Sequence, residues 1–258
     1  MTYTDSHAHL TSNTLFPQAE EILERARGAG VSTIINICTD NETLERGIAL
    51  AQAHPWVHNT AATTPHDVEK EGESEFAGIA AAARTGKLVA IGETGLDYHY
   101  HHSPVPAQKL FLRRYLNLAL ECQLPVVIHC RDAFADFFEI LDADYTIGNR
   151  HAPGVLHCFT GTIQEAEEVI KRGWYLSLSG IVTFKKSEEL RAVAQLVPLE
   201  QLLIETDAPY LAPQSHRGKI NEPAYLVETA ALIAQIKGIT PEKLAQATTE
   251  NARTLFNL

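Results

Sequence analysis

The feature that most constrains the fold is a regular alternation of short apolar segments with longer amphipathic ones along the whole chain. Segments such as VSTIINI, PVVIH and LLIE are almost entirely apolar, which is typical of parallel strands covered on both faces. This pattern predicts strands at residues 3–9, 31–39, 57–63, 88–93, 125–129, 154–159, 174–179 and 202–207.

The segments between these strands carry apolar residues at helical spacing. They predict helices at residues 18–29, 42–53, 75–84, 108–122, 133–141, 163–172, 187–196, 223–236 and 241–256. Eight strands that alternate with helices predict an α/β fold, the (β/α)8 or TIM barrel. The alternative is a doubly wound open sheet, which normally has a glycine-rich phosphate-binding turn after an early strand. No GxGxxG sequence follows any of these strands, so the barrel is favoured.

Composition excludes several other classes of protein. No linker or low-complexity stretch interrupts the pattern, which predicts one domain over residues 1–258. No apolar run approaches the roughly 20 residues that a membrane-spanning helix needs, and no secretory signal is visible. The four cysteines form no CxxC pair, so we expect no disulfide framework and a cytoplasmic location. No feature of the sequence indicates an obligate protein partner.

The net charge of −11 counts against a protein that coats nucleic acid through broad phosphate neutralisation. It permits a nuclease, because metal ions can make one cleft positive on an acidic body.

Histidine and carboxylate residues gather where the predicted strands end, which is where TIM barrels carry their active sites. His7 and His9 lie two residues apart on a strand, so both point to one face and can chelate a divalent ion. Glu93 is two residues beyond Ile91 and four beyond Val89, and this alternation predicts that all three face the barrel interior.

Three more candidates complete the group. His129 and His157 end two successive strands, and Asp207 ends the last strand, which closes the ring beside the first. Each residue alone also fits a buried hydrogen bond or a rim salt bridge, but six of them converge on one end of the barrel. Glu205 points the same way from deeper in the strand, either as an acceptor for a ligand histidine or as a structural acid.

The number of candidate ligands exceeds what one catalytic ion needs, which is typically three protein ligands and a water. Two ions that share a carboxylate fit better, and such pairs are suited to in-line phosphoryl displacement. Histidine-rich sites suit Zn, Mn, Fe or Ni, whereas Mg prefers oxygen ligands. We therefore expect two divalent ions per chain.

The same residues carry a family resemblance. DSHAHL, GETGLDYH, IHCRDA, LHCFTG, SGIVTF and LLIETDAPYLAP, followed by HRGK and NEP, resemble in order the TatD family of metal-dependent deoxyribonucleases. The resemblance spans nearly the whole chain and implies a barrel of the metallo-dependent hydrolase type with Mg-supported activity on DNA. It also implies that His7, His9 and Asp207 hold one ion, that Glu93 bridges, and that His129 and His157 hold the other.

One position departs from the family pattern. The family usually has Gly-x-His-Pro-His after the third strand, and here Thr64 replaces the first histidine while His66 remains. The six candidate ligands are unaffected. The resemblance therefore implies altered substrate positioning near His66, with phosphate bound less tightly at Thr64.

Other residues are weaker candidates for contacts with substrate. Arg131 follows His129 by two residues and can face the cavity as a phosphate ligand, or pair with Asp132. Tyr98 begins an aromatic and histidine-rich loop that can stack on bases or simply be exposed. Arg217 lies in a loop that can supply positive charge or be solvated. Two residues should point away from the cavity and pack in the core, Cys130 and Cys158.

These observations predict a hydrolase that cleaves phosphodiester bonds of DNA, including single strands, with a metal-activated water. Asp207 is the expected general base and Glu93 the residue that holds the ions together. Hydrolysis of an amide or ester, including the ester of an acylated RNA, is the alternative, although related barrels often place a lysine where Glu93 stands. A non-catalytic binding protein is a second alternative, which the intact ligand set disfavours.

Overall fold

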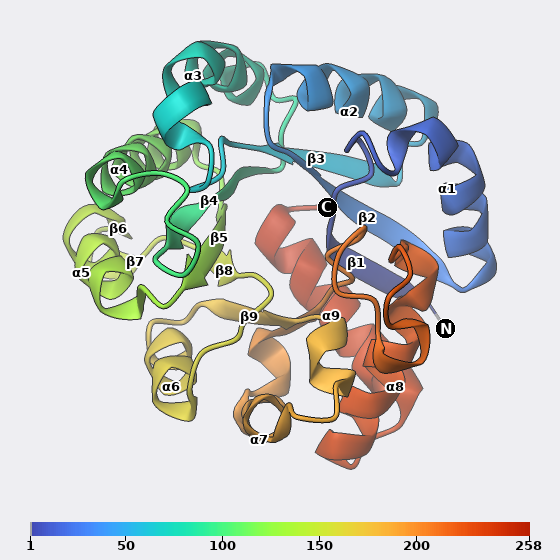
Figure 1. The fold of residues 1–258 in the computed structure, drawn as a ribbon. Helices are drawn as coiled ribbons and strands as arrows, with labels where there is room; N and C mark the ends of the chain where they lie inside the picture. The colour runs from blue at the N-terminus through green and yellow to red at the C-terminus, as the bar shows by residue number, and fades with distance from the viewer. Residues whose placement is uncertain (1) are drawn as a thin grey trace.

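Eight parallel strands form the central sheet of the computed structural model, which describes residues 2–258. Their order in the sheet is their order in the chain, β1-β2-β3-β4-β5-β8-β9-β10, and helices surround them (Figure 1). The arrangement confirms the predicted TIM barrel. The strands are β1 (Tyr3–Ala8), β2 (Val31–Cys38), β3 (Val57–Ala61), β4 (Ala90–Asp97), β5 (Val126–Arg131), β8 (Gly154–Leu156), β9 (Tyr175–Leu178) and β10 (Leu202–Ile204).

The helices follow the strands closely in sequence. Two of them begin with reciprocal capping hydrogen bonds, at Asp40 for α2 and at Thr162 for α6. None of the helices within residues 2–258 combines the length and apolar composition that a membrane crossing requires. They are α1 (Ala19–Gly28), α2 (Asn41–Ala53), α3 (Val68–Arg84), α4 (Val105–Cys122), α5 (Phe134–Asp144), α6 (Ile163–Lys171), α7 (Glu188–Leu196), α8 (Leu226–Lys237) and α9 (Pro241–Phe256). Short 3-10 turns are η1 (Phe16–Gln18), η2 (Gly180–Thr183), η3 (Leu199–Gln201), η4 (Gln214–His216) and η5 (Pro223–Tyr225).

The barrel closes between β1 and the chain that follows β10. The backbone N–H of Asp207 donates to the carbonyl of His7 (2.9 Å), and that of His9 donates to the carbonyl of Ala208 (2.7 Å). Below them, the buried Asp5 carboxylate accepts from the backbone N–H of Thr206 (2.9 Å) and from its hydroxyl (2.6 Å). This seam places the ends of the first and last strands side by side.

The end of α9 fills the barrel interior below the strand ends. Leu255 and Phe256 pack against inward side chains of the strands, including Ile37, Val127 and Leu203. Figure 1 shows the C-terminus near the centre of the ring. The opposite end of the interior, at the carboxyl ends of the strands, is left for polar side chains.

Strand β4 differs from its prediction in length and in register. It runs to Asp97 rather than ending at Glu93, and its pairing with β5 shifts between Ile91 and Thr94. Ala90 belongs to the cluster inside the barrel and Ile91 to the layer beneath the helices, so the predicted alternation through Val89, Ile91 and Glu93 is wrong. Glu93 faces inward because the register changes at Gly92, whose φ is 148°.

Two further elements were not predicted at full length. Helix α3 begins at Val68 rather than at residue 75. The prediction missed its first two turns because they are acidic and carry little apolar periodicity. The hairpin of β6 (Thr146–Ile147) and β7 (Arg150–His151) was missed, since two-residue strands leave no periodic pattern.

Candidate metal centre

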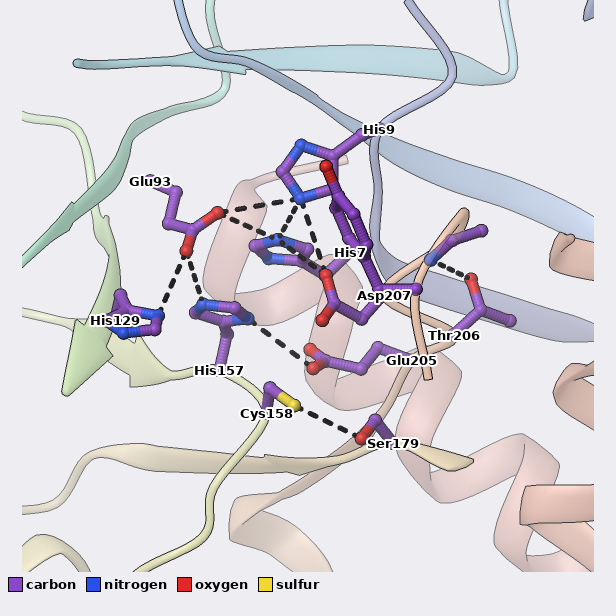
Figure 2. Close-up of polar contacts among 12 residues, drawn as sticks. His7, His9, Glu93, His129, His157, Cys158, Ser179, Glu205, Thr206 and Asp207 are labelled. Atoms are coloured by element: carbon purple, nitrogen blue, oxygen red, sulfur yellow. Dashed lines mark hydrogen bonds and ion pairs between the residues drawn. The ribbon is translucent and has the colours of Figure 1, made fainter. Parts of the chain in front are cut away.

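A first group of ligand atoms lies where β1 meets the chain after β10 (Figure 2). The Nε2 atoms of His7 and His9 are 3.3 Å apart. Glu93 Oε2 lies 3.3 Å and 3.6 Å from them, and Asp207 Oδ1 lies 3.7 Å and 3.4 Å from them. Two ligands about 2.0–2.1 Å from a tetrahedral ion are about 3.3–3.4 Å apart, so these spacings suit a divalent cation.

A second group of ligand atoms faces the other oxygen of Glu93. Glu93 Oε1 lies 3.2 Å from Nδ1 of His129 and 2.9 Å from Nε2 of His157. The ring of His157 stacks on that of His7, with centroids 3.8 Å apart, so the two groups are adjacent. Figure 2 shows Glu93 between them, with one oxygen directed to each group. The structure thus brings all six candidate ligands together.

Asp97 is a site residue that the sequence prediction missed. Its Oδ2 accepts from Nε2 of His129 (2.8 Å), which leaves Nδ1 of that ring free for a cation. Its Oδ1 accepts from the backbone N–H groups of His99 (2.9 Å) and Tyr100 (2.8 Å), which fixes the loop after β4. Asp97 was missed because the strand was predicted to end at Glu93, although an alternating pattern continued through Gly95 would have placed it on the same face.

Glu205 lies fully buried below the second group. Its Oε1 is 3.5 Å from Nδ1 of His157, and its Oε2 accepts from the hydroxyl of Ser177. Nδ1 of His157 has no closer hydrogen-bond partner among the described residues. This is the arrangement expected of a carboxylate that orients a ligand histidine.

The surroundings favour the ligating forms of Glu93 and His7. Burial acts to raise the pKa of Glu93, but the charge of His157 and hydrogen bonds from His129 and His157 hold this pKa well below its ordinary value. Burial, together with the neighbouring His157, lowers the pKa of His7 and favours its neutral ring. Ionised carboxylates and neutral imidazoles are the forms that bind divalent cations. Burial acts to lower the pKa of His129 and His157, but the neighbouring carboxylates outweigh it and raise the pKa of both rings, so a cation would replace a proton there.

A cavity of about 760 Å³ opens above the ligand groups and includes several predicted substrate contacts. His66 and Arg131 line this cavity, as does Thr64, whose hydroxyl donates to Asp67 (2.9 Å). The structure does not place Tyr98 or Arg217 among the residues that line the cavity.

The hydroxyl of Tyr98 donates to Asp136 (2.6 Å), and the guanidinium of Arg217 lies 4.0 Å from the centre of the Phe184 ring. Two exposed aromatic residues line the cavity instead, Tyr100 and Tyr210.

The prediction for two cysteines was wrong for Cys158 and only partly correct for Cys130. Cys130 is buried beneath the helices, as expected, but it also borders the cavity. Cys158 lies beyond the end of β8 and has a positive φ of 44°, so strand alternation does not govern its direction. Its Sγ is 3.2 Å from the hydroxyl of Ser179, at the cavity wall.

Comparison with known proteins identifies the family. A family model described as TatD related DNase matches residues 4–257. An uncharacterized metal-dependent hydrolase of Bacillus subtilis, YabD, is 39% identical over 98% of this chain and 98% of its own length. The 3'-5' ssDNA/RNA exonuclease TatD of Citrobacter rodentium is 38% identical over 98% of this chain and 97% of its own length.

A solved structure gives the same result. The TatD homologue YJJV of Escherichia coli superposes with a TM-score of 0.90 and 30% identity, over 99% of this chain and 98% of that one. A phosphotriesterase homology protein of Escherichia coli, at 13% identity and a TM-score of 0.73, shares the fold. The resemblance seen in the sequence is confirmed, and the chain belongs to the TatD related DNase family of metal-dependent hydrolases.

Proposed function

We propose that this protein hydrolyses phosphodiester bonds of DNA, including single strands, with two divalent cations bound per chain. The observation that carries the proposal is the position of Glu93, whose two oxygens face two separate ligand groups at 2.9–3.6 Å. The name of the Citrobacter rodentium relative, a nuclease of single-stranded DNA and RNA, supports nucleic acid as the substrate.

The donor atoms suit divalent cations. His7, His9, Asp207 and one Glu93 oxygen would hold one cation, and His129, His157 and the other Glu93 oxygen would hold the second. The nitrogen-rich set favours Zn, Mn, Fe or Ni for tight binding, and Mg can still support turnover. When bound, two such cations would polarise the phosphoryl group and lower the pKa of a coordinated water.

Asp207 is the proposed general base. Its carboxylate lies at the cavity wall, beside His9, and its side chain is 11% exposed. It accepts a proton from the attacking water as the water oxygen bonds to phosphorus. The bond between phosphorus and the leaving alcohol oxygen breaks, and that oxygen takes a proton from solvent. Charge stabilisation carries much of such a reaction, so little further acid–base machinery is needed.

Arg131 and His66 are the proposed contacts to the non-bridging phosphate oxygens. Both line the cavity. The guanidinium of Arg131 lies 4.9 Å from the centre of the Tyr100 ring and forms no ion pair with any carboxylate of residues 2–258. Its donors are therefore free for phosphate. The alternative pairing with Asp132 is not seen, because that carboxylate faces His99.

The deciding experiment measures activity and metal content on one preparation. Single-stranded DNA, duplex DNA, RNA, a chromogenic phosphodiester and a panel of amides and carboxylic esters are incubated with Mg, Mn or Zn. We expect metal-dependent cleavage of single-stranded DNA and about two ions per chain by elemental analysis. Cleavage confined to amides or esters, or no more than one ion after full reconstitution, would overturn the proposal.

A further inference from the structure

Four cations beside the cavity have no carboxylate partner within residues 2–258. Lys185 and Lys186 follow η2, and Arg217 and Lys219 lie in the loop between Asp207 and Asn221. We call these four residues the basic rim. All four are exposed. Elsewhere, basic side chains such as Arg25, Arg84 and Arg172 are paired with Glu or Asp.

The two loops of the basic rim are attached to the cavity mouth and to each other. Ile181 and Leu211 line the cavity at the bases of the two loops. The backbone N–H of Phe184 donates to the carbonyl of Ile181 (2.9 Å), and that of Gln214 donates to the hydroxyl of Thr183 (2.8 Å). Arg217 lies over the ring of Phe184, so the cations of both loops gather on one side of the mouth.

The two loop stretches that carry the basic rim contain no acidic residue, although Glu188 and Glu189 follow Lys186 closely and Glu228 pairs with His216. No acidic residue occurs between Glu168 and Glu188, or between Asp207 and Glu222. The opposite side of the barrel has the reverse character. Strand β3 is four positions from β9 in a ring of eight, and the chain after β3 carries four exposed acidic residues, Asp67, Glu69, Glu71 and Glu73. The mouth of an acidic protein is therefore electrostatically one-sided.

We propose that a single-stranded nucleic acid leaves the metal centre across the basic rim, with its backbone phosphates on these four residues. This inference rests on the proposed function. A polyanion that left over α3 would meet these carboxylates instead, of which Glu73 is paired with Arg114, so the charge distribution favours the path across the basic rim. The contacts are to phosphate and carry no sequence preference. None of the four residues lines the cavity, so a substrate as small as a chromogenic diester should depend on them far less.

Two double variants test the path. Lys185→Ala with Lys186→Ala removes one loop's charge, and Arg217→Ala with Lys219→Ala removes the other's. Lys70→Ala with Lys87→Ala is the matched control, because these two lysines are exposed, unpaired within residues 2–258, and far from the basic rim in sequence. The substrates are a 20-nucleotide single strand and bis(p-nitrophenyl) phosphate.

Each rim variant should raise KM for the 20-mer about tenfold, while kcat/KM for the small diester falls far less. The slope of log affinity against log salt should fall by about 1.4, because each lost phosphate contact contributes about 0.7 for a single strand. The control should leave both quantities as in the wild type. Equal KM and equal salt slopes in rim and control variants would overturn the path.

A binding measurement separates this inference from the proposed function. Fluorescence anisotropy of a labelled 20-mer is measured in a chelator, where no cleavage can occur. A reduced salt slope in the rim variants, on a wild type that cleaves no nucleic acid, would support the path and refute the nuclease. Cleavage by the wild type with no effect of the rim variants on binding would support the nuclease and refute the path.

Discussion

Glu93 presents one carboxylate to two ligand groups, so its charge should matter to both cations. We expect Glu93→Gln to weaken both metal sites, because a neutral amide removes attraction to each ion. His157→Ala should weaken mainly the second site, since its Nε2 faces only Glu93 Oε1. Isothermal titration calorimetry of metal binding to both variants checks these two expectations. Two intact affinities in Glu93→Gln would refute the shared carboxylate.

Asp207 combines a place in the first ligand group with access to the cavity. Asp207→Asn keeps the shape of the side chain but cannot accept a proton. We expect kcat to fall by about 10²–10⁴-fold with a much smaller change in KM. Metal content must be measured in the same sample, because the residue is also a candidate ligand. A kcat within a few-fold of wild type at full metal content would exclude Asp207 as the base.

Thr64 lines the cavity with its hydroxyl engaged by Asp67, so it offers little to a phosphate. A histidine there can carry charge, and a charged hydrogen bond is roughly twice as strong as a neutral one. Thr64→His should therefore lower KM for single-stranded DNA, and His66→Ala should raise it, both with unchanged metal content. Wild-type kinetics in both folded variants would assign the two positions to packing.

At the scale of the element, β4 shows how a strand is adapted to a site. Gly95 pairs with His129 across β4 and β5 and has a φ of 148°. A Cβ on Gly95 would lie 1.8 Å from the carbonyl oxygen of His129. The close approach of the two strands at this point keeps His129 within contact distance of both Glu93 and Asp97.

Gly95→Ala should thus disturb both the strand and the second ligand group. We expect a loss of about 2–3 kcal/mol in the free energy of unfolding and weaker binding of one cation. Gly86→Ala is the control, because Gly86 also has positive φ (70°) but nothing within 4 Å of the added Cβ. It should cost only about 1–2 kcal/mol. Urea unfolding and metal titration of both variants distinguish steric overlap from backbone strain alone.

The strand ends explain what could be predicted from the sequence. Periodicity located all eight strands, and the fold rule then placed the six ligands together. The inward direction of Glu93 was predicted from an alternation that the structure does not contain, because a register shift at Gly92 is invisible to counting by two. Asp97 was missed because the strand was predicted to end four residues before it. In the loop beyond, Tyr98 and Tyr100 have similar sequence surroundings. Only their contacts distinguish them, because the half-buried Tyr98 bonds to Asp136 and Tyr100 lines the cavity.

For the molecule as a whole, the end of α9 packs with apolar strand residues inside the barrel. Phe256 is 2% exposed and packs with strand residues of the interior. Phe256→Ala should lower the free energy of unfolding by about 3–5 kcal/mol. Leu258→Ala, at an exposed position of the same terminus (39%), should cost well under 1 kcal/mol. Equal unfolding midpoints in denaturant would show that α9 does not support the interior.

The closure of the barrel between β1 and the chain after β10 has a consequence for the order of assembly. Asp5 and Thr206 are 201 residues apart in the chain, and His7 and Asp207 meet across the same seam. A ribosome releases the two histidines of β1 long before it adds the carboxylate that completes their group. Until then, no emerging fragment holds a full set of donors for the first cation. Tight metal capture therefore marks a chain whose two ends have already met.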